Sequence, residues 1–310
     1  MSALICGSMA YDTIMVFPDK FKHHILPEQV HILNVAFLVP ELRREYGGCA
    51  GNIAYNLKLL GEEPRIMATV GKDFAPYSQW LTVCGITQDS IKVMEEAFTA
   101  QAYITTDLDD NQITAFHPGA MSFSHQNLVP NDPHIRIGLI SPDGKEGMIQ
   151  HAAQFKEKGI PFIFDPGQGM PMFDGDELLS LVEMATWVTL NDYEAQLMEE
   201  RTGLIPEEMA QKVDGLIITK GAQGSLIYTP HETFHIPSAK PQATLDPTGC
   251  GDAYRAGLVY GLLQGFDMAT TGRIASLMGA IKIETYGTQN HAFTLQTFKE
   301  RYRENFGGSF

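Results

Sequence analysis

The most informative stretch of this 310-residue chain reads Asp246-Pro247-Thr248-Gly249-Cys250-Gly251-Asp252-Ala253-Tyr254-Arg255-Ala256-Gly257. Its glycines predict a tight turn, and the residues after them predict the start of a helix. The first N–H groups of a helix and the positive end of its dipole point at one spot, which suits a phosphate. We therefore predict a catalytic base at Asp252 and an anion hole formed with the backbone of Gly249, Cys250 and Gly251. The alternative is a glycine-rich turn in which Asp252 only caps the helix.

A second glycine-rich stretch reads Gly47-Gly48-Cys49-Ala50-Gly51-Asn52-Ile53-Ala54, and a helical segment follows it. Small residues let the backbone approach a ligand closely. Asn52 offers hydrogen-bond donors and acceptors, which suits a sugar diol. Taken alone, the stretch fits an ordinary helix start with a capping asparagine equally well, so both interpretations stay open.

Short apolar runs alternate with segments of helical period through most of the chain, at residues 65–70, 74–84, 137–141, 146–158, 161–165, 177–184, 187–190, 194–201 and 215–219. This alternation predicts an α/β fold, with a mainly parallel sheet covered by helices on both faces. Residues 11–45 and 98–123 break the rhythm, and 100–106 and 112–116 read as strands. We expect a small β-rich lid, inserted in a single domain that spans residues 1–310.

The composition is that of a globular protein, since 44% of the residues are hydrophobic and 19% are charged. The formal net charge is −15, and the basic residues form no stripe. This argues against nucleic acid and against a membrane surface as partners. The four cysteines lie far apart, and neither a signal peptide nor a span of about 20 apolar residues is recognisable. We expect a cytoplasmic protein with reduced thiols.

The two glycine-rich stretches together resemble the two signatures of the ribokinase/pfkB family of kinases. Residues 48–71 fit the N-terminal signature, and residues 246–259 fit the C-terminal one, except that Cys250 replaces the usual Ala or Gly. The chain looks most like the bacterial adenosine and nucleoside kinases of that family, including the segment Asp165-Pro166-Gly167-Gln168-Gly169. The resemblance implies a ribokinase-like fold and an ATP-dependent phosphotransferase with an alcohol group as acceptor.

The resemblance also implies roles outside the two signatures. Asn191 and Glu194 are expected near the ATP phosphates, with Glu194 acting on Mg²⁺ through water. A later segment is expected to line the nucleotide groove with Thr219, Lys220, Gly221 and Gly224. The structural alternatives are that Asn191 caps a helix and that Lys220 and Gly221 form a simple turn.

Family members often bind a monovalent cation beside the anion hole. By resemblance, Asp246 and Thr248 would hold K⁺ together with carbonyl groups near residues 286–288. Hard oxygen ligands suit this ion, which would stiffen the phosphate-binding turn. The expected cofactors are thus Mg²⁺ and K⁺, with ATP as co-substrate. A homodimer paired through an exposed lid sheet, as in several relatives, is compatible with the sequence but not required by it.

The acceptor is expected to be a nucleoside, with adenosine phosphorylated to AMP at its 5′-hydroxyl in purine salvage. Relatives use an Asp after the first strand to grip adjacent hydroxyls, which implies a ribose site formed by Asp12, Gly47, Gly48 and Asn52. The lid is unusually apolar, and aromatic and thioether side chains can sandwich a flat purine. The base is therefore expected near Phe116, Gly119, Met121 and Gln168. Gln168 fits a structural turn amide equally well.

Two other functions stay open. A sugar kinase of the same family, acting on ribose or fructose, would share these motifs. A non-catalytic nucleoside- or nucleotide-binding protein would keep the fold without the reaction.

Arg255 also has two interpretations. Animal adenosine kinases carry a lid Arg that reaches a phosphate, and Gln112 stands at that position here. In one interpretation Arg255 contacts the phosphate instead. In the other, Arg255 forms a surface ion pair.

One further motif is rejected. His231-Glu232-Thr233-Phe234-His235 matches the HExxH pattern of zinc proteases, whose two His lie one turn apart on a helix. Pro230 and Pro237 flank the motif, and a strand-like run precedes it. We therefore predict a hairpin.

Overall fold

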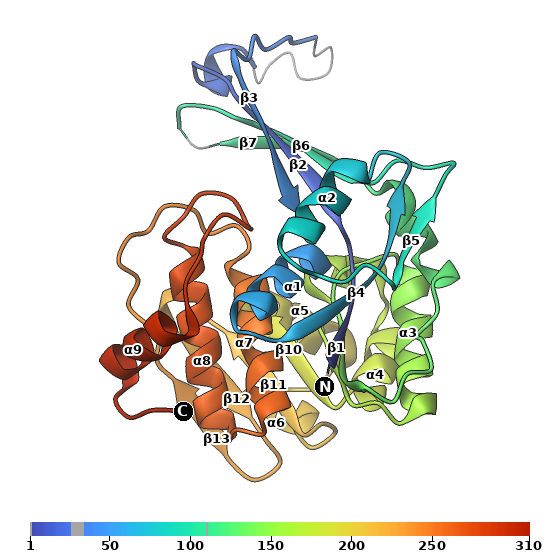
Figure 1. Ribbon diagram of the computed structural model, residues 1–310, viewed down its shortest axis with the longest axis vertical. Helices are drawn as coiled ribbons and strands as arrows, with labels where there is room; N and C mark the ends of the chain where they lie inside the picture. The colour runs from blue at the N-terminus through green and yellow to red at the C-terminus, as the bar shows by residue number, and fades with distance from the viewer. Residues whose placement is uncertain (1, 26–33, 110) are drawn as a thin grey trace.

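The computed structural model describes residues 2–25, 34–109 and 111–310. In these residues nine strands form one sheet (Figure 1), in the spatial order β13 (Thr233–Ile236), β12 (Ser225–Tyr228), β11 (Gly215–Thr219), β10 (Trp187–Asn191), β9 (Phe162–Phe164), β8 (Ile135–Ile140), β1 (Ser2–Cys6), β4 (Glu63–Gly71) and β5 (Ile91–Met94). Neighbouring strands from β5 to β11 are parallel, whereas β12 and β13 are antiparallel. The mainly parallel sheet predicted from the sequence is confirmed.

Helices cover both faces of this sheet, as predicted. They are α1 (Cys49–Leu59), α2 (Ala75–Val83), α3 (Lys145–Lys158), α4 (Gly175–Met184), α5 (Asp192–Thr202), α6 (Pro206–Met209), α7 (Cys250–Gln264), α8 (Met268–Lys282) and α9 (Leu295–Phe306). Side chains of β1 alternate between two cores. Ala3 and Ile5 pack with α1, α7 and α8, whereas Leu4 and Cys6 pack with α3 and α4. No helix among the described residues is long and apolar enough to span a lipid bilayer.

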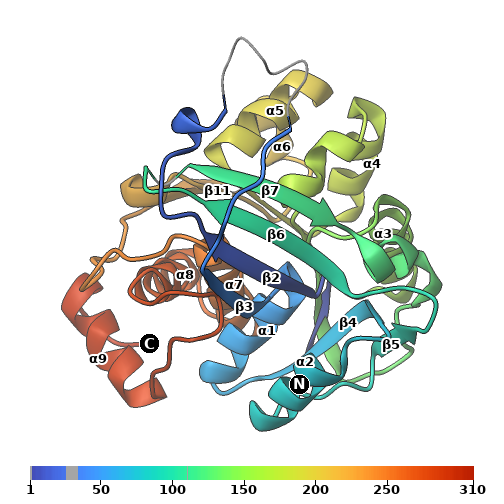
Figure 2. The ribbon, with the colours of Figure 1, turned by 90° about the horizontal axis from the view of Figure 1, so that it is seen from above.

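A second sheet lies over one end of the main sheet (Figures 1 and 2). Its described strands follow the order β3 (Glu41–Gly47), β2 (Ala10–Val16), β6 (Ala100–Thr106) and β7 (Gln112–His117). This is the predicted small β-rich lid, and the expected strands at 100–106 and 112–116 are β6 and β7. Residues 26–33 and residue 110 of the expected lid lie outside the described residues. Because β2 follows β1 closely, the lid sits at the edge where the parallel strands end.

The HExxH pattern lies in an antiparallel hairpin, as predicted. His235 belongs to β13, which pairs with β12, and His231 lies before β13 begins. The two His residues are therefore not one turn apart on a helix. The chain also contains short 3-10 helices, namely η1 (Phe21–His23), η3 (Gly119–Gln126), η4 (Gly167–Met172) and η5 (Gly221–Gln223).

Candidate active site

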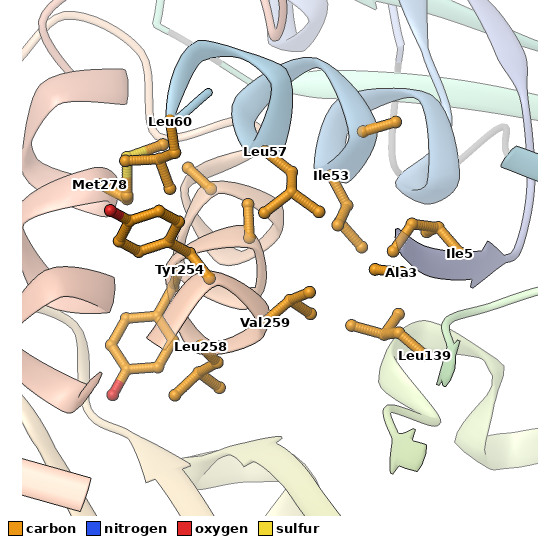
Figure 3. Close-up of a cluster of buried hydrophobic side chains, with 14 of the residues drawn as sticks. Ala3, Ile5, Ile53, Leu57, Leu60, Leu139, Tyr254, Leu258, Val259 and Met278 are labelled. Atoms are coloured by element: carbon orange, nitrogen blue, oxygen red, sulfur yellow. The ribbon is translucent and has the colours of Figure 1, made fainter. Parts of the chain in front are cut away.

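Helices α1 and α7 bring the two glycine-rich segments together. They pack through a buried apolar cluster that includes Leu57 of α1 and Val259 of α7 (Figure 3). Each helix begins after a glycine with positive φ, 85° at Gly48 and 78° at Gly249. Residues with a side chain rarely adopt this backbone conformation, so glycine allows each abrupt entry into a helix. The N-cap glycines offer no side-chain cap. The Cys250 amide, which was predicted to belong to the anion hole, instead donates to the Pro247 carbonyl at 3.1 Å, so the amides that α7 can offer an anion are the next ones, those of Gly251 and Asp252.

The carboxylate of Asp252 lies where these two helices begin. Nδ2 of Asn52, in the first turn of α1, donates a hydrogen bond of 2.8 Å to Oδ2 of Asp252. Burial raises the pKa of Asp252 to about 6, while the hydrogen bond from Asn52 and the charge of Arg255 oppose this rise. A carboxylate with this pKa is ionised at neutral pH and still basic enough to accept a proton. The two residues predicted as base and acceptor-binding amide are thus in direct contact.

Asp12, Gly47 and Gly48 form the next part of the site. Asp12 of β2 stands opposite Glu45 of β3. Burial, followed by the charge of Glu45, raises the pKa of Asp12 to about 6. A Cβ atom on Gly47 would collide with the Asp12 carboxylate, and one on Gly48 would lie 2.6 Å from the Ala10 nitrogen. The two glycines therefore let the lid strand β2 pack closely against the start of α1.

Behind Asn52 lies a buried network that the sequence analysis missed. Nε2 of Gln289 donates to Oδ1 of Asn52 at 3.0 Å and to the Tyr77 hydroxyl at 2.7 Å. Oε1 of Gln289 accepts from the indole of Trp80 at 2.8 Å. Since the Gln289 oxygen faces Trp80, its amino group faces Asn52, which directs the Asn52 amino group toward Asp252. The available sequence signal was the position of Gln289 beside the loop predicted to bind a cation.

Arg255 forms a buried ion pair with Asp165, so its interpretation as a surface ion pair is wrong. Nε and Nη2 donate to the two carboxylate oxygens at 2.8 and 3.0 Å. Arg255 is 6% exposed and Asp165 is 3% exposed. Burial acts to lower the pKa of Arg255, but Asp165 and Glu194 raise it overall. Asp165 was missed as a site residue, although its position directly after a buried strand is a signal. A phosphate contact of Arg255 stays a prediction.

Asn191 caps helix α5, so the structural alternative is confirmed for this residue. Its Oδ1 accepts from the Glu194 amide at 2.7 Å, and Oε2 of Glu194 accepts from the Asn191 amide at 2.8 Å. Burial and then the charge of Asp165 raise the pKa of Glu194, whereas the hydrogen bond from the Asn191 amide acts to lower it.

In the part of the chain that the structure describes, no group of three or more His, Cys, Asp or Glu side chains could hold a metal. A Mg²⁺ held mainly by phosphates and water needs only one or two carboxylates, and Glu194 fits that requirement.

Comparisons with known proteins agree with this geometry. Residues 9–294 match the family described as pfkB family carbohydrate kinase. The chain belongs to the pfkB family. A nucleoside kinase of Methanocaldococcus jannaschii is 31% identical over 274 residues, which cover 88% of this chain and 90% of the relative. A structure of Burkholderia thailandensis nucleoside kinase in complex with inosine is 48% identical, with a TM-score of 0.90 and 99% of each chain covered.

A second structure of the Burkholderia enzyme, in complex with ADP-inosine, is 50% identical, with a TM-score of 0.88 over 99% of this chain and 97% of that one. The ribokinase-like fold and the family resemblance are therefore confirmed. This pfkB kinase is a phosphotransferase with an alcohol group as acceptor.

In this pfkB kinase, the segment expected to line the nucleotide groove runs from the end of β11 through η5 to the start of β12, and contains Thr219, Lys220, Gly221 and Gly224. A surface hollow of about 370 Å³ opens there, lined by Lys220, Gln223, Ser225, Leu226, His235, Ile236 and Pro237. The Ser225 hydroxyl lies 2.7 Å from the Tyr254 hydroxyl of α7. The hollow is thus joined directly to the helix that carries Asp252.

The residues expected near a base lie at three places. Phe116 is in β7, whose side chains are all exposed, and 51% of its surface is accessible. Gly119 and Met121 belong to η3, and Gln168 is exposed in η4. The structure thus leaves Phe116 on an exposed strand of the lid. Contacts between these residues and a base stay predictions.

Asp246 meets the later loop, as the resemblance implies, but the surroundings do not fit K⁺. Oδ1 of Asp246 accepts from the Thr248 amide and Oδ2 from the Gly287 amide, each at 2.9 Å. Nζ of Lys282 lies 3.8 Å from the same carboxylate. Burial acts to raise the pKa of Asp246, but these amides and Lys282 lower it overall. Each carboxylate oxygen of Asp246 already accepts an N–H, and the Lys282 ammonium lies beside Oδ2, so a K⁺ ion at this carboxylate would meet a like charge.

Proposed function

We propose that this pfkB kinase is a nucleoside kinase, which transfers the γ-phosphate of ATP to the 5′-hydroxyl of a nucleoside. Adenosine is the first acceptor we expect, with AMP as product in purine salvage. The proposal is carried by the 2.8 Å hydrogen bond between Asn52 and Asp252, since it joins an acceptor-binding amide to a base. Two similar proteins support a nucleoside as the acceptor, namely the nucleoside kinase of M. jannaschii and the B. thailandensis nucleoside kinase in complex with inosine.

The chemistry follows from the order of the groups. Asp12 and Asn52 hold the ribose diol, and the 5′-hydroxyl faces Asp252. A carboxylate oxygen of Asp252 takes the hydroxyl proton while the 5′-oxygen forms a bond to the γ-phosphorus. The bond from that phosphorus to the oxygen bridging the β-phosphate breaks, and ADP leaves. The developing charge would be stabilised by the amides of Gly249, Gly251 and Asp252 at the start of α7, since the Cys250 amide already donates to the Pro247 carbonyl.

ATP is proposed to bind at the hollow beside Lys220. Glu194, with Asn191 at the same helix start, would hold Mg²⁺ through water, and bound Mg²⁺ neutralises charge on the phosphates. Arg255 lies 4.0 Å from Glu194 while it binds Asp165. Its positive charge offsets both carboxylates, so the phosphates approach a less negative surface.

The base is proposed to lie under the lid, against Phe116 and Met121, with Gln168 reading its edge. The exposure of Phe116 supports this, since an apolar side chain with half its surface in water gains free energy when a flat ring covers it. Lid closure over the acceptor would exclude water, which otherwise competes for the phosphoryl group.

A panel of acceptors tests the proposal. The purified chain is given ATP, Mg²⁺ and, in parallel, adenosine, inosine, guanosine, cytidine, ribose or fructose, and ADP release is measured. We expect the highest kcat/KM for a purine nucleoside, with a 5′-monophosphate identified by ³¹P NMR. Higher values for ribose or fructose than for every nucleoside would identify a sugar kinase. Transfer by wild type no faster than by Asp252→Asn, over the whole panel, would identify a non-catalytic binding protein.

We also propose a homodimer paired through the lid. Strand β7 is an edge strand of the small sheet, and its side chains are exposed. Exposed edge strands offer backbone groups that another chain can pair with. Sedimentation velocity of the full chain should show a dimer, and a monomer at micromolar concentration would contradict it.

A further inference from the structure

Lys282 ends helix α8, and its side chain is fully buried, with 0% of its surface exposed. Its Nζ donates to the backbone carbonyl of Asp246 at 2.8 Å and to that of Thr285 at 3.3 Å. It also lies 3.8 Å from the Asp246 carboxylate. A buried charge without such partners would be costly. These oxygens explain how the interior accommodates an ammonium group.

The ammonium lies at the base of the anion-hole turn. Asp246 begins that turn, and Gly249 ends it where α7 starts. The Gly287 amide holds Asp246, and the next residue, Thr288, packs on Gly249, where a Cβ atom would lie 3.0 Å from its methyl group. Lys282, the loop around Gly287 and the turn therefore form one connected unit. A charge at its centre acts on the geometry of the whole turn.

We propose that the Lys282 ammonium takes the place of the monovalent cation in this chain and stiffens the anion-hole turn, so that phosphoryl transfer needs no K⁺. The inference rests on the proposed function, in which this turn binds the transferred phosphoryl group. Two observations carry it. Amide donors already bind both carboxylate oxygens of Asp246, and the ammonium already binds carbonyl oxygens of the kind that coordinate an alkali ion. Lys282 is thus a positioning residue that acts through Asp246.

The first test uses the wild-type chain. Nucleoside phosphorylation is measured in KCl, NaCl and choline chloride at equal ionic strength, with ATP and Mg²⁺ held constant. The expected result is the same kcat and the same KM values in all three salts. A rate that rises with K⁺ and saturates would overturn the proposal.

The second test removes the ammonium. Lys282→Ala should lower kcat by about tenfold or more in choline chloride, which corresponds to about 1.4 kcal/mol on the barrier. Adding K⁺, ammonium or methylammonium should restore part of the lost activity, because removal of the lysine side chain leaves a space beside Asp246 that a small cation can fill. Lys282→Met fills most of that space without charge, so it should lose activity without rescue. Lys212→Ala removes an accessible lysine and serves as the control for a lost positive charge. Full activity of Lys282→Ala in choline chloride would overturn the proposal.

A readout without catalysis separates this inference from the proposed function. K⁺ should raise the Tm of Lys282→Ala and leave that of the wild type unchanged. Crystals soaked in a thallium(I) salt should show an anomalous peak beside Asp246 in Lys282→Ala only. Such a peak in the wild type would overturn the proposal, whatever the enzyme phosphorylates. If no acceptor of the panel is phosphorylated, the proposed function fails, and thallium binding still decides which cation stands beside Asp246. If Lys282→Ala does not fold, the wild-type salt series and thallium map decide alone.

Discussion

The side-chain amino group of Asn52 donates a 2.8 Å hydrogen bond to the carboxylate of Asp252, although the two residues lie 200 positions apart. Gln289 binds the other end of the Asn52 amide and so keeps that amino group turned toward Asp252. The hydrogen bond favours the ionised carboxylate, whereas burial favours the neutral acid. The orientation of one amide therefore influences the protonation of the proposed base.

Replacing Asp252 by Asn should remove transfer without unfolding the chain. Loss of a general base costs about 10²- to 10⁴-fold in rate, so we expect kcat to fall within that range. Burial raises the pKa of Asp252 from 3.8 to about 6, so the folded state favours the neutral acid. The stability that the neutral acid adds is fully present below pH 3.8 and is lost as pH rises through about 6. The neutral variant should therefore keep or raise the Tm at pH 7.5. Steady-state kinetics and thermal denaturation of the same samples check both expectations, and a wild-type kcat would contradict the assignment.

The pH profile of kcat/KM should report two carboxylates. Asp12 and Asp252 both have pKa values raised to about 6, mainly by burial, and both are proposed to act in the ionised form. Activity should therefore fall as pH falls below about 6, and each group contributes about tenfold per pH unit. The slope of log(kcat/KM) should approach 2 in the wild type and 1 in Asp12→Asn. A profile that stays flat down to about pH 5 would contradict both roles.

Replacing Asn52 by Asp should shift that profile. Two carboxylates would then face each other, and the like charge raises the pKa of Asp252. The midpoint of the acidic limb of kcat/KM should move up by about one pH unit or more. Asn56→Asp changes another buried asparagine of α1 and serves as the control, because this change should lower stability without moving the midpoint. An unshifted midpoint in Asn52→Asp would rule out the coupling.

The ion pair of Arg255 and Asp165 should matter for stability. Arg255→Met leaves the Asp165 carboxylate buried without its partner, which costs about 3–5 kcal/mol. Adding Asp165→Leu should recover most of that loss. Urea denaturation gives the free energy of unfolding for each variant. The accessible pair of Lys212 and Glu183 is the control. Lys212→Met should change the free energy of unfolding by less than about 1 kcal/mol. A similarly small effect of Arg255→Met would contradict the expectation.

Gly47→Ala should weaken acceptor binding selectively. Its Cβ atom would displace the Asp12 carboxylate, which is proposed to hold the ribose diol. We expect KM for the nucleoside to rise by about tenfold, equivalent to about 1.4 kcal/mol, with KM for ATP unchanged. Asp12→Asn should raise the same constant. Equal effects on both substrates would indicate a general distortion instead.

Local patterns were sufficient for much of the fold. The expected strand at 215–219 coincides with β11, and the one at 100–106 coincides with β6. In both segments the strand pattern is contained in the residues themselves. Asn52 and Asp252 were predicted from the glycines beside each of them together with the family resemblance, and the structure brings the two side chains into contact. Their roles stay predictions.

Residues whose role depends on distant partners were not found. Arg255 was assigned to the surface in one interpretation because its partner Asp165 lies 90 positions away. Lys282 stands in the last turn of a helix, where an exposed lysine is common because it complements the dipole. Its burial depends on how α8 meets the turn at Asp246, which no local pattern contains. Gln289 was missed because its three partners come from two distant helices, Asn52 from α1 and Tyr77 and Trp80 from α2.

Among the described residues, four chain segments join the lid to the body, namely β1 to β2, β3 to α1, β5 to β6 and β7 to η3, and the first two carry proposed acceptor-binding groups. Strand β3 passes into α1 through Gly48, and β2, which contains Asp12, follows β1 after a short connection. A nucleoside that binds both Asp12 of the lid and Asn52 of α1 would therefore hold the lid against the body. This implies a favourable coupling between the two substrates, in which bound nucleoside tightens the binding of ATP and bound ATP tightens that of the nucleoside by the same factor. Calorimetric titration of a non-hydrolysable ATP analogue, with and without the nucleoside, would measure that coupling directly.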